Sequence, residues 1–231
     1  MIWVKPGCCT GKDHDRAVKS KETERKQHWE AVYGSKPAHQ TSWHQSHPEL
    51  SLSMIENSGI SRDAELIDVG CGASILLDYL LKLGFRHITV LDISRAALEQ
   101  AQERLGDHSL SVQWIESDVT QYVPGQRFEL WHDRAAFHFL TADSERRRYV
   151  DVLHKALAPG GQAIISTFAP GGPPRCSGLD VIRYDAEKLA LELGAEFILE
   201  EQREEIHTTP LDRKQPFNYF RFRRTLPVFQ G

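Results

Sequence analysis

The sequence predicts a single α/β domain built on a doubly wound, mostly parallel sheet with helices on both faces. Short apolar runs of strand length alternate with amphipathic segments of helix length between residues 63 and 168. The chain of 231 residues is long enough for one full core and barely long enough for two. Its 40% hydrophobic and 26% charged residues are ordinary for a globular protein, which argues against a fibrous or disordered chain.

The N-terminal part of the chain predicts helices without strands. Residues 1–20 mix charge, glycine and cysteine without any period, so we expect a mobile arm there. Residues 21–33 form a charged helix with a few apolar side chains on one side. A proline suited to a first turn and a glycine suited to a stop bound a second helix at 48–57. Together, residues 21–60 are expected to cover a larger body.

The central part, residues 63–168, predicts the body itself. Strands that alternate with helices pair in parallel through right-handed crossovers, and this places helices on both faces of the sheet. The charged run Glu145–Arg148 is expected on the exposed face of its helix. The predicted strands are 64–69, 87–92, 110–117, 127–133 and 162–168, and the predicted helices are 75–84, 94–106 and 144–161.

Residues 169–231 differ in pattern. A loop, "APGGPPRCSG", follows the fifth strand and is expected to arch over a substrate pocket, and a helix follows at 185–194. Two long alternating strands, 196–207 and 217–225, are joined by a proline-containing loop. Such a pair meets antiparallel, so the sheet should end in an antiparallel C-terminal strand.

The turn after the first strand, "DVGCGAS", is the first candidate for a binding site. In open α/β sheets the ligand lies beyond the carboxyl ends of the strands, and Gly70 and Gly72 let the backbone approach it closely. A dinucleotide fingerprint requires a small residue where Ile75 stands, and the Asp68 carboxylate would repel phosphates. The turn therefore favours a cationic, adenosine-bearing ligand.

Acidic residues follow at the ends of the next strands. Asp92, 20 residues after Gly72, has the position of a carboxylate that accepts hydrogen bonds from ribose hydroxyls. Asp118 lies at the next exit, within reach of an adenine amine, and Asp133 lies at the fourth. Any one of these aspartates is at least as often a helix cap, but four in step indicate a binding edge.

These motifs resemble those of a known family. "LIDVGCGAS", "ITVLDIS", "ESDVT", "LWHDRAAFHFL" and "LAPGGQAIISTF" look like the successive motifs of the class I S-adenosylmethionine-dependent methyltransferases over residues 65–168. That resemblance implies an enzyme with a Rossmann-like sheet, the cofactor S-adenosyl-L-methionine and the product S-adenosyl-L-homocysteine. "FAPGGPPRCSGLDVIRYD" resembles a bacterial group of small methyltransferases akin to the methyltransferase-like proteins, some of which act on protein lysines.

The resemblance also implies which residues would hold the cofactor. Residues before the first strand commonly roof the cofactor in this family, which suggests Tyr33, Trp43 and His44, although ordinary packing explains Trp43 about as well. The implied cofactor contacts are Asp68, Gly70, Cys71, Gly72, Asp92, Ile93, Asp118, Val119, His132, Tyr33 and Trp43.

Methyl transfer chiefly requires that an acceptor lone pair be aligned with the methyl group, and a general base is needed only if the acceptor arrives protonated. His138 sits in an apolar run typical of a core histidine, His207 could equally be a surface residue, and Cys176 could be simple packing. Arg175 and Arg183 could contact an anionic acceptor, although such arginines are more often solvated. The candidate catalytic residues are His138, His132, Asp133, Cys176 and His207.

Several functions are disfavoured. The fourth strand exit lacks the N/D-P-P-Y/F motif of many adenine and glutamine methylases, and no spaced Cys/His cluster predicts a metal. A net charge of −4 gives no attraction for nucleic acid or anionic membranes, and the N-terminus lacks a secretory signal, so we expect a cytoplasmic protein.

The acceptor stays open at this point. We expect a small thiol or other chalcogen, amine or hydroxyl rather than a protein. A protein-lysine methyltransferase and a non-catalytic S-adenosylmethionine-binding sensor remain alternatives. The sequence leaves the oligomeric state undetermined.

Overall fold

A seven-stranded sheet runs through the protein in the order β3-β2-β1-β4-β5-β9-β8. The computed structural model describes residues 11–225, with side chains from residue 22 onward. Strands β1 to β5 are parallel, and β9 is antiparallel to both β5 and β8. The strands are β1 Glu65–Val69, β2 His87–Asp92, β3 Val112–Glu116, β4 Phe128–Arg134, β5 Leu157–Phe168, β8 Phe197–Thr208 and β9 Lys214–Arg224.

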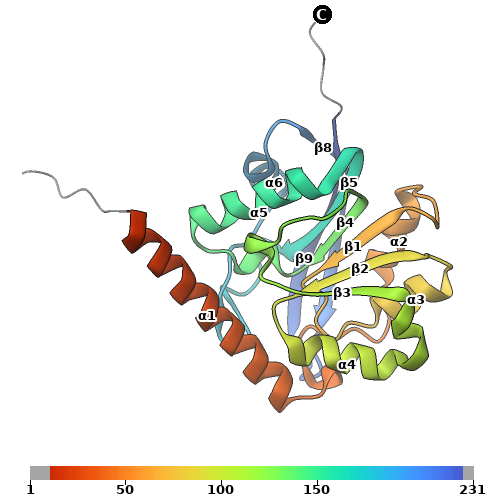
Figure 1. The fold of residues 1–231 in the computed structure, drawn as a ribbon, viewed down its shortest axis with the longest axis horizontal. Helices are drawn as coiled ribbons and strands as arrows, with labels where there is room; N and C mark the ends of the chain where they lie inside the picture. The colour runs from red at the N-terminus through yellow and green to blue at the C-terminus, as the bar shows by residue number, and fades with distance from the viewer. Residues whose placement is uncertain (1–10, 226–231) are drawn as a thin grey trace, which may run out of the picture.

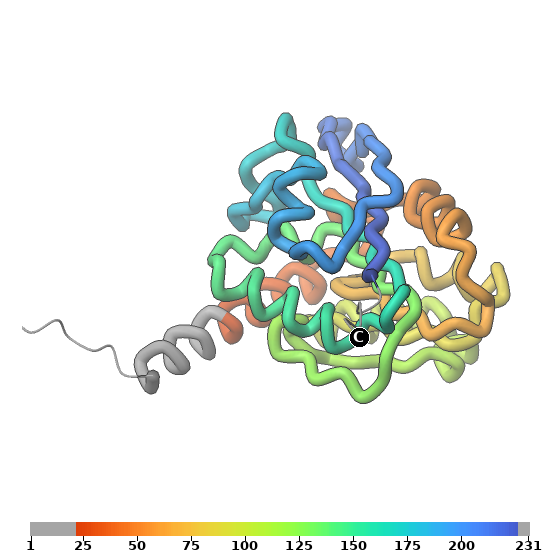
Figure 2. Tube along the Cα trace, turned by 90° about the horizontal axis from the view of Figure 1, so that it is seen from above, coloured from red at the N-terminus to blue at the C-terminus, as the bar shows by residue number. Residues whose placement is uncertain are grey.

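Helices cover both faces of this sheet (Figure 1). Side chains of α5 and α6 join one apolar cluster, and side chains of α2, α3 and α4 join the other. Helix α1 lies beside α4, as the view from above also shows (Figure 2). The helices are α1 Gly11–Ser35, α2 Glu49–Asn57, α3 Leu76–Lys82, α4 Arg95–Leu105, α5 Asp143–Ala156 and α6 Ala186–Leu193.

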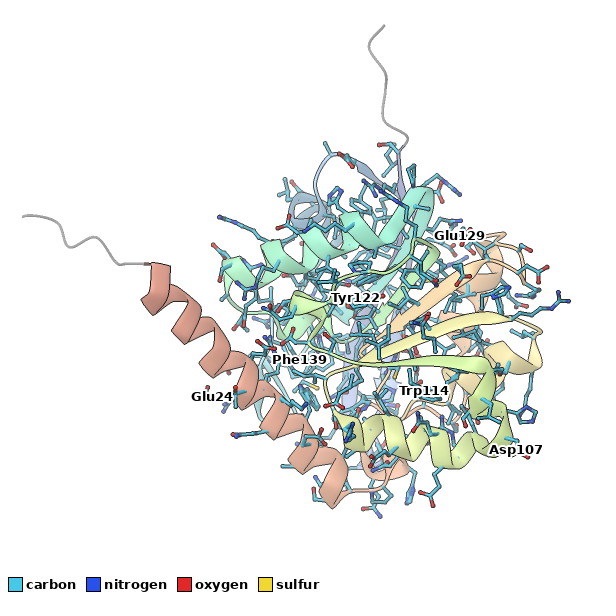
Figure 3. The ribbon with its side chains drawn as sticks, in the orientation of Figure 1. Glu24, Asp107, Trp114, Tyr122, Glu129 and Phe139 are labelled. Atoms are coloured by element: carbon cyan, nitrogen blue, oxygen red, sulfur yellow. The ribbon has the colours of Figure 1, made fainter. Side chains whose placement is uncertain are left out.

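The two clusters follow from the alternation of side chains along the strands. In β1, Ile67 and Val69 belong to the cluster of α5 and α6, whereas Leu66 belongs to that of α2 and α3. All three are buried, as expected for a strand covered on both faces. Figure 3 shows side chains filling both layers, with Phe139 in the interior beside α1 and Glu129 at the periphery.

The architecture confirms the predicted fold class. From β1 the strand order runs outward in both directions, through β2 to β3 on one side and through β4 to β5 on the other. This change of direction at β1 places the carboxyl ends of β1 and β4 at a crevice, where open α/β sheets bind ligands. None of the helices in the described part of the chain is long and apolar enough to cross a membrane.

The structure departs from the sequence predictions at four places. Helix α1 begins at Gly11, ten residues before the predicted start, while residues 1–10 of the predicted arm lie outside the described range. The segment "LAPGG" opens β5 and does not end α5. A short ribbon of β6 (Arg175–Cys176) and β7 (Leu179–Asp180) forms in the loop after β5 and was not predicted.

The run Glu145–Arg148 is the fourth departure, because its first two residues are buried. The Glu145 carboxylate forms an ion pair with the Arg25 guanidinium of α1 at 3.3 Å. Arg146 is paired with Glu192 of α6 at 2.7 Å and also with Asp143. Charge alone indicated an exposed face, whereas partners from distant segments bury these groups.

Candidate functional site

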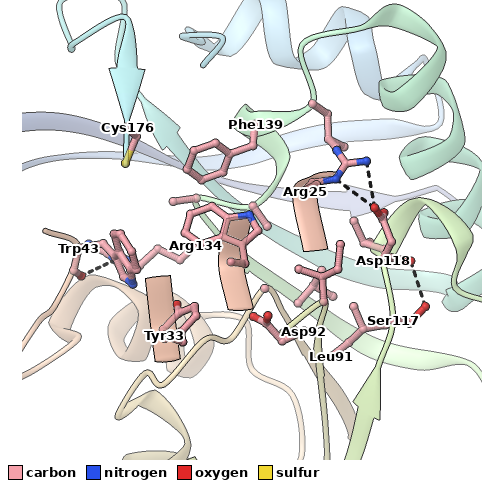
Figure 4. A pocket seen from close by; sticks show the side chains of 18 of the residues that line it. Arg25, Tyr33, Trp43, Leu91, Asp92, Ser117, Asp118, Arg134, Phe139 and Cys176 are labelled. Carbon is pink, nitrogen blue, oxygen red and sulfur yellow. Dashed lines mark hydrogen bonds and ion pairs between the residues drawn. The ribbon is translucent and has the colours of Figure 1, made fainter. Parts of the chain in front are cut away.

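A cavity with an empty volume of about 790 Å³, open solvent included, lies at the carboxyl ends of β1 to β4. We call it the main cavity (Figure 4). A smaller neighbour, the side cavity, shares Tyr33, Trp43, Gly70 and Arg134 with it. Of the predicted cofactor contacts, the main cavity is lined by Tyr33, Trp43, Gly70, Asp92, Ile93, Asp118 and Val119, and the side cavity by Tyr33, Trp43, Asp68, Gly70, Cys71 and His132.

The glycine turn after β1 is tightly packed. Gly70 and Gly72 have φ angles of 63° and 55°, a region that favours glycine. A Cβ at Gly70 would lie 2.5 Å from the Cβ of Ala136, and one at Gly72 would lie 2.1 Å from the Tyr33 hydroxyl. Glycine is therefore required at both positions by conformation and by space.

Asp92 lies at the end of β2 with its carboxylate in the cavity wall. Its two oxygens accept hydrogen bonds from the amides of Gly72 and Ser94, each at 2.8 Å. Burial raises the pKa of this carboxyl to about 6, even though both amides favour the charged form. Because each carboxylate oxygen can accept more than one hydrogen bond, Asp92 keeps capacity for the two hydroxyls of a ribose. The residue fits an adenosine-bearing cofactor.

Asp118 lines the same cavity, but its carboxylate is already engaged. Oδ2 accepts from Arg25 Nε at 3.0 Å and is paired with Arg25 Nη2 at 2.9 Å. Oδ1 accepts from the amide of Thr120 at 2.8 Å. In Figure 4, Arg25 of α1 reaches across the cavity edge to this aspartate. An adenine amine would therefore share Asp118 with Arg25.

Asp68 and His132 form a buried pair between β1 and β4. His132 Nδ1 lies 2.6 Å from Asp68 Oδ1, and His132 Nε2 lies 2.9 Å from the hydroxyl of Ser51. The His132 ring and the Asp68 carboxylate are both shielded from solvent, yet the pair borders the side cavity. The arrangement fixes Asp68 beneath the glycine turn, where it adds negative charge.

Asp133 supports the turn after β4. Its carboxylate accepts from the amides of Ala136 at 2.8 Å and Phe137 at 3.1 Å and from the Tyr149 hydroxyl at 2.7 Å. Burial raises its pKa to about 6. Ala135 in this turn has a φ of 68°, which a non-glycine residue adopts only when its surroundings hold it. Asp133 itself lines neither cavity.

The three remaining catalytic candidates differ in their surroundings. His138 is fully buried, its Nδ1 accepts from the Phe168 amide at 3.3 Å, and burial lowers its pKa to about 3. His207 Nε2 donates to the Ser42 carbonyl at 2.8 Å. Neither histidine lines the main or the side cavity, whereas Cys176 lines the main cavity, with a pKa raised by burial to about 11.

Aromatic rings that sequence reasoning did not assign form much of the wall. The ring centroids of Trp29 lie 5.6 Å from Trp43 and 5.0 Å from Phe139. Arg25, Trp29 and Tyr33 recur every four residues, so the spacing of one helical face could have placed them together. Arg134 and Phe217 also line the cavity, but no sequence signal distinguishes them. Within the described side chains, no group of three metal-ligating residues is found.

Comparison with known proteins gives matches to methyltransferases. Residues 66–161 match the family model described as a methyltransferase domain. The chain is 33% identical over 111 residues to malonyl-[acyl-carrier protein] O-methyltransferase 1 of Ilyobacter polytropus, covering 48% of this chain and 40% of that protein. It is 25% identical over 127 residues to the eEF1A lysine and N-terminal methyltransferase of Mus musculus, covering 54% and 18%.

The fold is also similar to solved structures. One is the 1,6-didemethyltoxoflavin-N1-methyltransferase of Burkholderia thailandensis, solved with bound S-adenosylhomocysteine. The TM-score is 0.63 at 20% identity, over 96% of this chain and 93% of the other. The chain thus matches one fold over nearly its full length, while it spans less than half of the length of the two curated relatives named.

Proposed function

The chain belongs to the class I S-adenosylmethionine-dependent methyltransferases, and from this premise we propose that it transfers a methyl group from S-adenosyl-L-methionine to a small nucleophilic acceptor. The observation that carries the proposal is the main cavity, whose wall combines the buried carboxylate of Asp92 with aromatic rings. Asp92 would hold the ribose, and Gly70 and Ile93 would contact the adenosine.

The reaction would be an in-line displacement. The lone pair of the acceptor attacks the methyl carbon, the bond from that carbon to the sulfonium breaks, and its electron pair stays on sulfur to give S-adenosyl-L-homocysteine. The protein would contribute mainly alignment, which is the larger part of catalysis when charge is neutralised in the reaction. An enclosing wall of Trp29, Trp43 and Phe139 would exclude water from the methyl group.

The ionisable groups of the main cavity favour an acceptor that needs little help from a base. In the described chain these groups are Arg25, Tyr33, Asp92, Asp118, Arg134 and Cys176. Burial raises the pKa values of Tyr33 and Cys176, so both stay protonated near pH 7. A thiol, which ionises near pH 8.5, or an unprotonated amine would attack without a strong base.

A second candidate is methylation of protein lysines. It is supported by the similarity to the eEF1A lysine and N-terminal methyltransferase and by the motif after β5. A lysine must first lose its proton. The two carboxylates of the main cavity are already assigned, Asp92 to the ribose and Asp118 to Arg25, so this candidate requires a further base. A cofactor sensor without activity is the third candidate.

Production of S-adenosylhomocysteine separates these candidates. The purified protein is incubated with S-adenosylmethionine and small thiols, sulfide, amines, phenols or a lysine-rich protein extract, with Asp92→Ala as the binding-deficient control. We expect turnover with at least one small acceptor. Turnover with the extract alone would favour the lysine candidate. Cofactor binding without turnover on either class of acceptor would contradict the small-acceptor proposal.

A further inference from the structure

Arg134 presents an arginine guanidinium that the contacts of the protein only partly satisfy. Its Nε donates to the Tyr219 hydroxyl at 2.9 Å and its Nη1 donates to the Trp43 carbonyl at 3.0 Å. Its Nη2 has no hydrogen-bond partner. The Glu205 carboxylate is 4.0 Å from Nη2, beyond hydrogen-bonding distance.

The charge of Arg134 is also only partly balanced. Its side chain is 13% exposed, so little water solvates the guanidinium. Glu205 is the one carboxylate paired with it in the described chain, and that carboxylate also accepts from Tyr219 at 2.9 Å and Gln45 at 2.8 Å. A buried cation is stabilised by a hydrogen-bonded anion. The Arg134 guanidinium still has N–H donors that no described group of the protein accepts.

The position of Arg134 indicates which ligand would supply the anion. The residue ends β4 and lines both cavities. Its partners Tyr219 and Phe217 come from β9, and Glu205 comes from β8, on the side of the sheet away from β2. Asp92, which would hold the ribose, is on β2. Figure 4 shows Trp43 and Cys176 on one side of the cavity and Asp118 and Ser117 on the other.

Rings surround this end of the cavity. The Arg134 guanidinium carbon lies 5.0 Å from the centroid of the Phe217 ring, and Trp43 and Phe139 line the same space. A flat ligand would stack on such walls while its anionic group reaches the guanidinium. Arg134 has the planar fork of donors that pairs with a carboxylate.

We propose that Arg134 binds the anionic group of the methyl acceptor, so that the substrate is a small ring-bearing acid whose nucleophile faces the cofactor. This inference rests on the proposed function, because it assigns the acceptor end of the same cavity. It adds a substrate class, the carboxylate-bearing aromatic acceptors, and a residue that selects it. Arg175 and Arg183, the arginines that the sequence suggested, do not line either cavity.

Binding of benzoate and benzamide to the protein saturated with S-adenosylhomocysteine tests the inference without turnover. The two probes have the same ring and differ in charge. We expect the wild type to bind benzoate at least about tenfold more tightly than benzamide, as a charge-assisted hydrogen bond provides. Arg134→Gln should lose this preference, and Arg134→Lys should keep part of it. Arg175→Gln, which changes an exposed arginine paired with Asp180, is the matched control and should bind as the wild type does.

Turnover with matched acceptors gives a second readout. Among thiophenol and the three mercaptobenzoates, at least one acid should be methylated with a higher kcat/KM than thiophenol, and Arg134→Gln should abolish that advantage. Equal binding of benzoate and benzamide by the wild type would overturn the inference. Thermal unfolding of each variant shows whether the fold is kept. If Arg134→Gln does not fold, Arg134→Lys, which retains the charge but not the planar fork, takes its place in the comparison.

The remaining arm separates the acceptor from the cofactor, which also carries a carboxylate. S-adenosylhomocysteine and 5′-methylthioadenosine share the adenosine, and only the former has the amino-acid end. If Arg134→Gln weakens the binding of S-adenosylhomocysteine and not that of 5′-methylthioadenosine, Arg134 binds the cofactor and the inference is overturned. If the wild type binds neither ligand, the proposed function itself fails. We expect both ligands to bind the variant as tightly as they bind the wild type.

Discussion

Asp92 combines two tasks in one carboxylate. It holds the glycine turn by accepting from the Gly72 amide, and it orders the start of α4 by accepting from the Ser94 amide. The same oxygens border the main cavity. Because burial raises its pKa to about 6, the charge of Asp92 is present at neutral pH and is lost in mildly acidic solution.

Cofactor affinity should therefore depend on pH through Asp92. The ionised carboxylate accepts from ribose hydroxyls more strongly than the neutral acid, so affinity for S-adenosylhomocysteine should fall as pH drops through about 6, by up to about tenfold per unit. Asp92→Asn should bind about tenfold more weakly at neutral pH and with a flatter profile. Calorimetric titrations between about pH 5 and 8 measure both. An equally steep profile in the variant would assign the titration to another group.

Cys176 lines the cavity as a neutral thiol. Its pKa of about 11 leaves little thiolate at pH 8, and the thiolate is the reactive form. We expect Cys176→Ser to keep the rate of methyl transfer within about twofold. In a background with Cys8 and Cys9 replaced by serine, iodoacetamide should modify Cys176 far more slowly than it modifies free cysteine. Rapid modification, or loss of transfer in a folded Cys176→Ser, would show that the thiol takes part in the reaction.

The grouping of Asp92 and Gly70 at one edge of the sheet could be predicted from the sequence, but the surroundings of Arg134 could not. Asp92 and Gly70 stand in a local pattern of strand, turn and helix, so spacing alone brings them to one edge. The surroundings of Arg134 are set by Tyr219 and Glu205, which are 85 and 71 positions away along the chain, so no local pattern reveals them. Asp133 shows the opposite case, because a conspicuous carboxylate in a motif is used to hold a turn.

At the scale of elements, the Glu30 side chain of α1 holds the start of α4, and Gln100 of α4 donates to the Tyr33 carbonyl of α1 at 2.6 Å. The carboxylate of Glu30 accepts from the amides of Arg95 at 2.7 Å and Ala96 at 3.1 Å and from the Ser94 hydroxyl at 3.2 Å. An acidic group at a helix N-terminus satisfies free amides and complements the helix dipole. Here the capping group comes from another helix, so the contact also fixes α1 over the cavity.

Removing this tie should loosen the cavity roof. Glu30→Ala leaves the α4 amides without their partner, which costs about 1 kcal/mol, and weakens the attachment of α1, which carries Trp29 and Tyr33. We expect S-adenosylhomocysteine to dissociate several-fold faster, as measured by stopped-flow displacement.

Glu103→Ala, an exposed glutamate on α4 itself, is the matched control for this experiment. It removes the same charge from the α4 region and touches no part of the roof. Its dissociation rate should equal that of the wild type. Equal rates in Glu30→Ala and the wild type would mean that the Glu30 contact does not help to retain the ligand.

Most elements of the central body followed from periodicity, because each buries a face against its neighbours. β2 matches its predicted range 87–92. The sequence pattern does not reveal the first ten residues of helix α1, because these residues carry no apolar period. The β6–β7 ribbon has only two residues in each strand, too short for any pattern to reveal.

At the scale of the whole molecule, buried ionisable groups oppose one another in mild acid. The pKa of His138 is lowered to about 3, so the unfolded chain binds more protons than the native one below pH 6.5, and stability is lost as pH falls. The pKa values of Asp92 and Asp133 are raised to about 6, so the native state binds more protons between about pH 4 and 6. Their contribution falls as pH rises through that window.

Because these contributions cancel in part, the effect of His138 is best measured as a difference between two proteins. Asn at position 138 can still accept from the Phe168 amide without titrating. The free energy of unfolding of the wild type should fall relative to that of His138→Asn by up to about 1.4 kcal/mol per unit as pH drops below 6.5. Urea unfolding at several pH values measures this, and His108→Asn, an exposed site, should show no such trend. Parallel curves for the wild type and His138→Asn would mean that this histidine accepts a proton as readily in the folded protein as in the unfolded chain.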